Sequence, residues 1–184
     1  TASLFNNIVD QDVLSLAGLE DVLTGGEALS VPHVCKALAH LPRLQLINGY
    51  GPTENTTFTT IHRITGADTD PGPIPIGRPI ARTRVAVLEP SGAPAPTGVW
   101  GEIVTGGDGL AEGYLNCPEL TGQAFIPDPD HSGQRLYRTG DLGRFRADGV
   151  LEFGGRLDDQ IKVHGYRIEL SEIERTFSQH PAVA

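Results

Sequence analysis

The chain contains no methionine, only two cysteines and few aromatic residues, which make up 6% of its 184 residues. Cys35 and Cys117 lie far apart and show no metal-ligand spacing, so we expect two buried thiols in a reducing, cytoplasmic setting. No stretch approaches the roughly 18 consecutive apolar residues of a membrane span, and no charged-then-apolar secretory leader is present. These absences predict a soluble protein with neither a disulfide framework nor a membrane-spanning helix.

Basic residues are also in short supply, because 14 Lys and Arg face 23 Asp and Glu, and the formal net charge is −9. Nucleic-acid binding relies on clustered Lys and Arg, and no basic stripe is present, so we expect no nucleic-acid partner. Glycine (23) and proline (14) are plentiful, which favours many turns between short strands over a helical bundle. The chain starts at Thr1 and ends in the apolar Pro181–Ala184, so we expect a piece of a longer polypeptide.

The stretch Asn48–Glu54 reads NGYGPTE and lies between the apolar Leu44–Ile47 and the β-rich Thr56–Ile61. A strand that stops at two glycines and a proline, then presents a hydroxyl and a carboxylate, brings backbone and small side chains against a polar ligand. This pattern is typical of a nucleotide site. It is equally typical of an ordinary turn before a strand or helix, so turn chemistry alone leaves both interpretations open.

The first third of the chain predicts a strand, a helix and a second, parallel strand. The first strand covers Leu19–Leu23 and runs into the turn at Gly25–Gly26. Ser30 can cap the helix that follows, and Leu44–Ile47 forms the next strand. In such a unit, ligands bind beyond the carboxyl ends of the strands, where both the first glycine turn and Gly49 are expected.

The middle of the chain predicts a surface connection followed by an antiparallel sheet. The run of Asp, Pro and Gly over Ala67–Ile80 is typical of an exposed linker at a subdomain boundary. Short strands are then expected at Arg84–Leu88, Gly101–Thr105, Arg135–Thr139, Gly143–Arg146 and Val150–Phe153. The turn Ala147–Gly149 joins the last two as a hairpin.

The last segment predicts a strand, a turn and a helix. Gln160–Val163 is the expected strand, and Gly165 marks the turn after it. Ser171 and Glu174 have the spacing of a capping box, which predicts that the helix starts there.

Six different motifs follow one another along nearly the whole chain, at Thr24–Glu27, Asn48–Glu54, Gly101–Ile103, Gly109–Tyr114, Tyr137–Leu142 and Gly155–Lys162. In this order and spacing they resemble the adenylate-forming enzyme superfamily, and most closely the amino-acid adenylation domains of nonribosomal peptide synthetases. The resemblance implies an α/β fold that covers the C-terminal part of the enzyme core. Residues 1–70 would end the αβ-layered core subdomain, residues 71–157 would form a β-rich subdomain, and residues 158–184 would begin the C-terminal lid domain.

The resemblance implies activation of an amino acid with ATP and Mg²⁺ to an aminoacyl-adenylate. The acyl group then passes to a phosphopantetheine thiol on a carrier-protein domain, so carrier and condensation domains of a parent synthetase are the implied partners. Thr53 is implied as a hydroxyl donor to the α-phosphate, and Glu54 as the Mg²⁺ ligand. The alternative for Glu54 is a solvated surface carboxylate.

The resemblance also assigns the nucleotide contacts. Asp141 is implied to accept from both ribose hydroxyls, and the alternative is an aspartate that stabilises the turn. Arg156 is implied to contact ribose or phosphate, and the alternative is a surface ion pair. Four further residues are implied to recognise adenine. The Tyr50 ring stacks on it and Phe153 closes part of the other side, while the Asn48 amide and the Gly26 backbone approach its edge.

Five positions are implied as the wall of the amino-acid pocket, namely Leu23, Gly25, Gly49, Thr57 and Phe58. Two glycines leave space and no charge is offered, which suits valine or a similar small branched residue. Asp158 falls at the hinge on which the lid would turn, the alternative being an exposed loop aspartate, and Gly165–Arg167 resembles the lid loop of the second step. His164 and Glu112 stand where many relatives carry Arg.

The family's phosphate loop would lie before Thr1, and its catalytic lysine after the last residue, so the segment alone is expected to be inactive. Two alternatives stay open. The first is an acyl-CoA or aryl-acid ligase of the same superfamily. The second is a non-enzymatic, β-rich interaction module that uses the glycines as turns.

Overall fold

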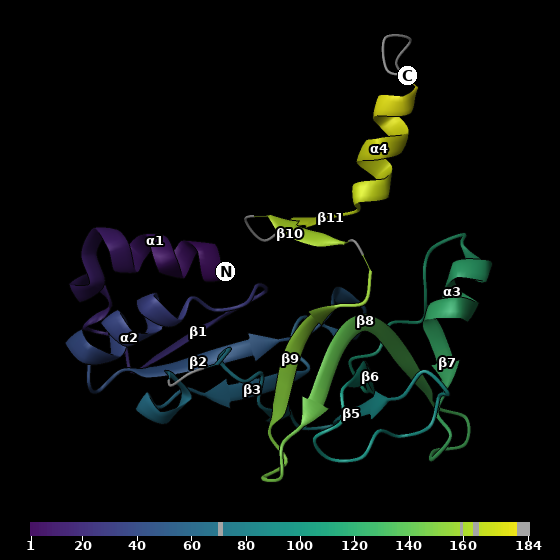
Figure 1. Cartoon of the computed structure of the whole chain (residues 1–184), viewed down its shortest axis with the longest axis horizontal. Coiled ribbons are helices and arrows are strands. Elements are labelled where there is room, and N and C mark those ends of the chain that lie inside the picture. Colours follow the sequence, from purple (N-terminus) through teal and green to yellow (C-terminus); the bar gives the residue numbers. More distant parts are fainter. Residues whose placement is uncertain (70–71, 159, 164–165, 180–184) are drawn as a thin grey trace.

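The structure is a computed structural model that describes residues 1–69, 72–158, 160–163 and 166–179. It contains a mixed four-stranded sheet, an antiparallel five-stranded sheet and a short C-terminal hairpin with a helix (Figure 1). The mixed sheet has the order β1-β2-β3-β4, and only β1 and β2 are parallel. Its elements are α1 (Ala2–Asp12), a 3₁₀ turn (Val13–Leu16), β1 (Asp21–Gly25), α2 (Val31–His40), β2 (Gln45–Tyr50), β3 (Thr60–Arg63) and β4 (Arg78–Pro79).

Helices α1 and α2 pack on the mixed sheet through apolar residues spaced at helical intervals (Figure 1). Phe5 and Val9 of α1 and Val34 and Ala37 of α2 are buried in one cluster with Leu46 of β2. The i, i+3 and i, i+4 spacing therefore determines which face of each helix is covered. Burial of these side chains removes most of their apolar surface from water and holds the helices over the strands.

The start of α2 agrees with the sequence except in its cap. Ser30 occupies the N-cap position, as predicted, and the proline after Val31 lies in the first turn. The Ser30 side chain makes no capping hydrogen bond, because its Oγ lies 2.6 Å from Nδ1 of His33 instead. Cys35 and Cys117 are exposed, which corrects the expectation of buried thiols: the first lies on the outer face of α2 and the second at the N-cap of α3 (Pro118–Ala124).

Strands β1 and β2 both end at later residues than the sequence predicts. The first begins at Asp21 and ends at Gly25, and the second continues through Gly49 to Tyr50 instead of stopping at Ile47. Gly25 and Gly49 are register partners, and a Cβ added to Gly25 would lie 1.8 Å from the carbonyl oxygen of Gly49. The glycines thus permit close strand pairing here, and β3 pairs with the other edge of β2. Both glycines lie at one edge of the sheet, as predicted.

The segment predicted as a surface connection is partly buried, which corrects that interpretation. Ile74 and Ile76 are each 5% exposed, and they belong to the two main apolar clusters. The backbone N–H of Ile76 donates to the carbonyl of Leu151, and the carbonyl of Pro75 accepts from Nδ2 of Asn48 at 2.8 Å. The alternating isoleucines thus make this segment a link between the two sheets.

The second sheet has the order β5-β6-β8-β7, with β9 also paired to β8, and all its pairs are antiparallel, as the sequence predicts. The strands are β5 (Thr83–Leu88), β6 (Gly101–Gly107), β7 (Phe125–Pro127), β8 (Arg135–Phe145) and β9 (Leu151–Arg156). The two strands predicted at Arg135–Thr139 and Gly143–Arg146 are one strand, because neighbours pair along both halves and a bulge at Leu142 absorbs the irregularity.

The C-terminal hairpin consists of β10 (Ile161–Val163) and β11 (Tyr166–Ile168), and α4 (Leu170–Ser178) follows it. Figure 1 shows α4 standing apart from both sheets. The N-cap of α4 is Glu169, so the capping box predicted at Ser171 is wrong: the extended backbone of Glu169 starts the helix one residue before Ser171. Gly165 and His164, which belong to the predicted turn and lid loop, lie outside the described residues. No described helix has the length and apolar character needed to cross a membrane.

Candidate functional site

Three adjoining cavities lie beside β8 and the start of the hairpin segment, two of them at the ends of β1 and β2 and one beside α3. They measure about 730, 310 and 450 Å³ and are called here the first, second and third cavity. All three are lined by Arg156 and Gln160, so these two side chains form a shared rim. Cavities of this size are typical of small-molecule sites in proteins.

The first cavity is lined by all six residues predicted to bind the nucleotide: Gly26, Asn48, Tyr50, Asp141, Phe153 and Arg156. The rings of Tyr50 and Phe153 lie 6.1 Å apart with an interplanar angle of 42°. The Asn48 amide donates to the backbone of the linking segment, so its position is fixed by that bond. The arrangement offers a flat ligand two aromatic rings and a carboxylate in one space.

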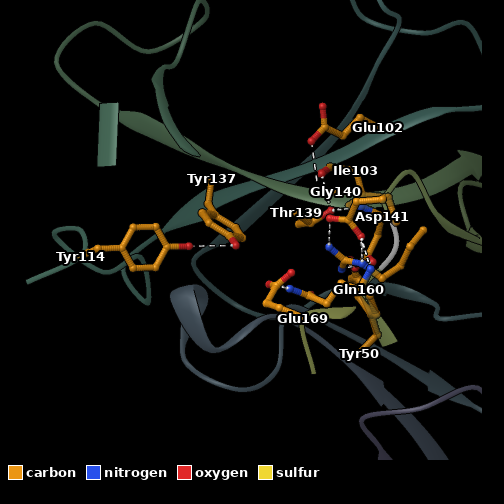
Figure 2. Close-up of polar contacts among 12 residues, drawn as sticks. Tyr50, Glu102, Ile103, Tyr114, Tyr137, Thr139, Gly140, Asp141, Gln160 and Glu169 are labelled. Atoms are coloured by element: carbon orange, nitrogen blue, oxygen red, sulfur yellow. Dashed lines mark hydrogen bonds and ion pairs between the residues drawn. The ribbon is translucent and has the colours of Figure 1, made fainter. Parts of the chain in front are cut away.

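Asp141 is the acidic centre of this cavity and is only 7% exposed. Its carboxylate accepts from the Tyr50 hydroxyl at 2.5 Å and from Nη1 of Arg156 at 2.7 Å, and its backbone N–H donates to Oγ1 of Thr139 (Figure 2). Burial, and then the negative charge of Asp141, raise the pKa of Tyr50, so this hydroxyl stays protonated and acts as a donor.

Arg156 connects two of the predicted residues. Besides Asp141, its guanidinium binds Asp158 through Nε at 2.6 Å and through Nη2 at 2.7 Å. The predicted ribose carboxylate and the predicted hinge carboxylate therefore share one cation. Arg156 does form ion pairs, but its side chain is 15% exposed and these pairs lie at the rim of all three cavities.

Strand β8 carries three buried polar side chains of the site. Tyr137, Thr139 and Asp141 occupy every second position along it (Figure 2). Gly140 between them has a φ of +70°, and its N–H donates to Oε1 of Glu102 at 3.1 Å. Glu102 also accepts from Nε of Arg138 at 2.9 Å, and that bond and the charge of Glu102 raise the pKa of Arg138.

The second cavity is lined by all five positions predicted for the amino-acid pocket, Leu23, Gly25, Gly49, Thr57 and Phe58. A Cβ added to Gly49 would lie 2.5 Å from Cε1 of Phe58 and 3.1 Å from Cδ1 of Leu23, so the absence of a side chain there keeps the space open. Thr57 has a φ of +67°, which is strained for a β-branched residue and turns the chain just before the phenylalanine ring.

The third cavity holds Glu54, which lies in the 3₁₀ turn Thr53–Asn55 and is 8% exposed. This burial excludes the alternative of a solvated surface carboxylate. Thr53, one residue earlier, lines the second cavity instead, so adjacent residues of the turn serve neighbouring spaces. Glu54 does not line the cavity of Tyr50 and Asp141, and its own cavity adjoins that one at the shared rim.

Within the described part of the chain, no group of three His, Cys, Asp or Glu side chains is arranged to hold a metal ion. A fully protein-coordinated metal site is therefore not present in those residues. One buried carboxylate at the edge of a cavity suits Mg²⁺, because this ion keeps several waters and takes phosphate oxygens as its other ligands. The donor set at Glu54 thus fits the implied ion.

Sequence reasoning missed three residues of the site, namely Glu102, Tyr114 and Gln160. Glu102 and Tyr114 belong to motifs that the sequence singles out, but their contacts join positions far apart in the chain. Gln160 is buried at the shared rim, and its side chain donates to Oε1 of Glu169 (Figure 2). Its signal was its place in the Gly155–Lys162 motif, beside the hinge aspartate.

The comparisons with known proteins show the family to which the chain belongs. The family model of the AMP-binding enzyme matches residues 1–115. A linear gramicidin synthase of Brevibacillus parabrevis is 52% identical over 185 residues, which is 100% of this chain and 4% of that protein. Bacitracin synthase 1 of Bacillus licheniformis is 48% identical over 180 residues, which is 98% of this chain and 3% of that protein.

Solved structures agree in fold as well. PA1221, a nonribosomal peptide synthetase protein that contains adenylation and PCP domains, superimposes with a TM-score of 0.92 at 49% identity, covering 98% of this chain and 37% of that one. NpsA-ThdA, an artificially fused adenylation-PCP di-domain from Klebsiella oxytoca, gives a TM-score of 0.88 at 28% identity, covering 98% of this chain and 34% of that one. The chain thus spans about a third of the solved structures and a few per cent of the synthases.

Proposed function

We propose that this chain helps to join an amino acid to AMP, since it belongs to the AMP-binding enzyme family and forms part of an adenylation domain of a nonribosomal peptide synthetase. The reaction consumes ATP and releases pyrophosphate. The observation that supports this proposal most directly is the rim at Arg156 and Gln160, on which an aromatic and acidic cavity, an apolar cavity and a carboxylate-bearing cavity meet.

The first cavity is the proposed nucleotide site. Adenine lies against Tyr50 and Phe153, and its edge approaches Asn48 and Gly26. Asp141 accepts from the ribose hydroxyls, because an ionised carboxylate has about four lone-pair sites and is the natural acceptor for two neighbouring hydroxyl groups.

The reacting groups lie next to this site. The carboxylate of the amino acid attacks the α-phosphorus, and two anions repel each other, so donors and cations must offset the charge that accumulates. Thr53 supplies a hydroxyl, Arg156 supplies positive charge, and Glu54 would hold Mg²⁺. When bound, Mg²⁺ would neutralise part of the phosphate charge.

The second cavity is the proposed amino-acid site. Its Leu23 and Phe58 walls are apolar, Gly25 and Gly49 leave room, and its volume of about 310 Å³ lies at the small end for ligand sites. These features support valine or a similar small branched amino acid as the substrate.

The same proposal covers the arrangement of the chain and its partners. Residues 1–70 and 71–157 belong to the enzyme core, and residues 158–184 begin a lid that turns at Asp158, which Arg156 anchors in this structure. The acyl group then passes to the phosphopantetheine thiol of a carrier domain, next to which condensation domains act. The PCP domains of solved relatives support this partner.

The test measures amino-acid-dependent ATP–pyrophosphate exchange by the complete synthetase that carries this chain, over a panel of amino acids, aryl acids and fatty acids. We expect exchange with small branched amino acids, and a loss of about 10²-fold or more in Glu54→Gln, the usual cost of a lost transition-state contact. Exchange only with aryl or fatty acids would reject the substrate class. Exchange that Glu54→Gln leaves unchanged would reject the role of this carboxylate.

A further inference from the structure

The loop over Gly109–Tyr114 stands out in the sequence, yet the reaction described above gives it no task. In the structure this loop is fastened to the turn that carries Glu54. The N–H of Ala111 donates to the carbonyl of Glu54 at 2.8 Å, and the hydroxyl of Thr56 donates to the carbonyl of Gly109 at 2.7 Å. Two backbone positions of the loop therefore determine how far it lies from the turn.

A third bond connects the loop to the carboxylate itself. The hydroxyl of Tyr114 donates to Oε1 of Glu54 at 2.7 Å, across a separation of 60 residues. Both side chains line the third cavity. The first two bonds hold the backbone of the turn, whereas this one acts on the group that we propose to bind Mg²⁺.

The position of Tyr114 is itself tightly determined. Its ring meets Phe125 edge-on with centroids 5.7 Å apart, its hydroxyl lies 3.3 Å from that of Tyr137 (Figure 2), and its backbone N–H donates to Oγ1 of Thr121 at 2.9 Å. Gly113 has a φ of +149°, and a Cβ there would lie 2.4 Å from the Thr121 methyl group. The glycine before the tyrosine therefore permits the close approach of the loop to α3.

The hydroxyl acts only as a proton donor toward the carboxylate. An ionised carboxylate has no proton to donate, so the phenol is the donor in this bond. The bond from Tyr114 occupies one of the about four lone-pair sites of an ionised carboxylate.

We propose that Tyr114 is a positioning residue that orients the carboxylate of Glu54 for a divalent cation bound together with the nucleotide. This inference rests on the proposed function, in which Glu54 is the metal ligand. Residues that hydrogen-bond to metal ligands typically change metal affinity or activity by about 10–100-fold when they are mutated. Loss of the hydroxyl allows the carboxylate to rotate away from the direction that the cation requires.

The experiment compares the binding of a non-hydrolysable ATP analogue to the complete synthetase at saturating Mg²⁺ and in EDTA, by calorimetry. Tyr114→Phe removes the hydroxyl and keeps the ring. Thr56→Ala is the matched control, because it also removes one hydroxyl bond between the loop and the turn without touching the carboxylate. Glu54→Gln reports whether this carboxylate is the metal ligand.

We expect Tyr114→Phe to weaken analogue binding about tenfold in Mg²⁺ and less than twofold in EDTA. Thr56→Ala should change both values less than twofold. The melting temperature of each variant shows whether the domain still folds.

If Tyr114→Phe weakens analogue binding equally in both buffers, the role of Tyr114 is structural and the inference is overturned. The inference is also overturned if Tyr114→Phe binds the analogue like the wild type while Glu54→Gln loses its response to Mg²⁺. In that second case the proposed function stands. A full Mg²⁺ response in Glu54→Gln would overturn the role of Glu54, and the inference with it.

Discussion

The substitution Asp141→Asn tests the proposed ribose contact most directly. It keeps the shape of a side chain that is 7% exposed and removes its charge. A hydrogen bond to a charged group is worth about 1.5–3 kcal/mol, against about 1 kcal/mol for a neutral one, so two ribose hydroxyls lose about 2 kcal/mol together. Since about 1.4 kcal/mol is a factor of ten, ATP should bind about thirtyfold more weakly.

The assay separates loss of the ribose contact from general damage. ATP and 2′,3′-dideoxy-ATP are titrated into the wild-type synthetase and into Asp141→Asn, which completes a thermodynamic cycle between one side chain and one part of the ligand. The wild type should prefer ATP strongly, and the preference of the variant should be about thirtyfold smaller. Additive losses, or an unchanged preference in the variant, would refute the assignment.

Asp128 provides the matched control for this experiment. It is also 7% exposed, and it accepts from an arginine, Arg84, at 2.7 Å, the distance at which Asp141 accepts from Arg156. It does not line any of the three cavities. Asp128→Asn should therefore reduce stability and leave the preference for ATP over the dideoxy nucleotide unchanged.

Two further predictions concern the second cavity and Asp128. Gly49→Ala should displace the Phe58 ring and move the ratio of kcat/KM from valine toward alanine by about tenfold or more, measured by pyrophosphate exchange. Burial alone would raise the pKa of Asp128, but the Asp130 N–H, His131 and Arg84 outweigh it and lower the pKa. The stability lost in Asp128→Asn should therefore be measurable by urea unfolding above about pH 4 and vanish as the pH falls through the lowered, folded-state pKa.

Sequence patterns predicted the elements that local chemistry determines. The strands around the glycine pair, α2 and the antiparallel sheet follow from apolar periodicity and turn residues, which act over a few positions. The motif residues of the first and second cavities also lie together, because the ends of β1 and β2 come close to β8 and β9. The predicted ends of the strands were less accurate. Strand β2 continues past Ile47 because β1 and β3 pair with its last residues.

Contacts between distant segments could not be predicted in this way. The Pro- and Gly-rich composition around Ile74 indicates a loop, but its burial depends on a sheet that forms elsewhere in the chain. Tyr50 meets Asp141 across 91 residues, and Tyr114 meets Glu54 across 60. No local pattern encodes these pairs, so the hydrogen-bond network of the site became visible only in the folded chain.

The pleat of β8 has a consequence for how this protein tolerates change. The pairing of β8 with β6 is interrupted between Arg138 and Leu142, where Gly140 has a φ of +70°. Around this interruption, Tyr137 lines the third cavity, Thr139 the second and third, and Asp141 the first and second. Insertion or deletion of a single residue between Tyr137 and Thr139 would move the upstream side chains of β8 to the opposite face and remove Tyr137 from the third cavity. A two-residue change would keep each side chain on its face and shift it along the strand.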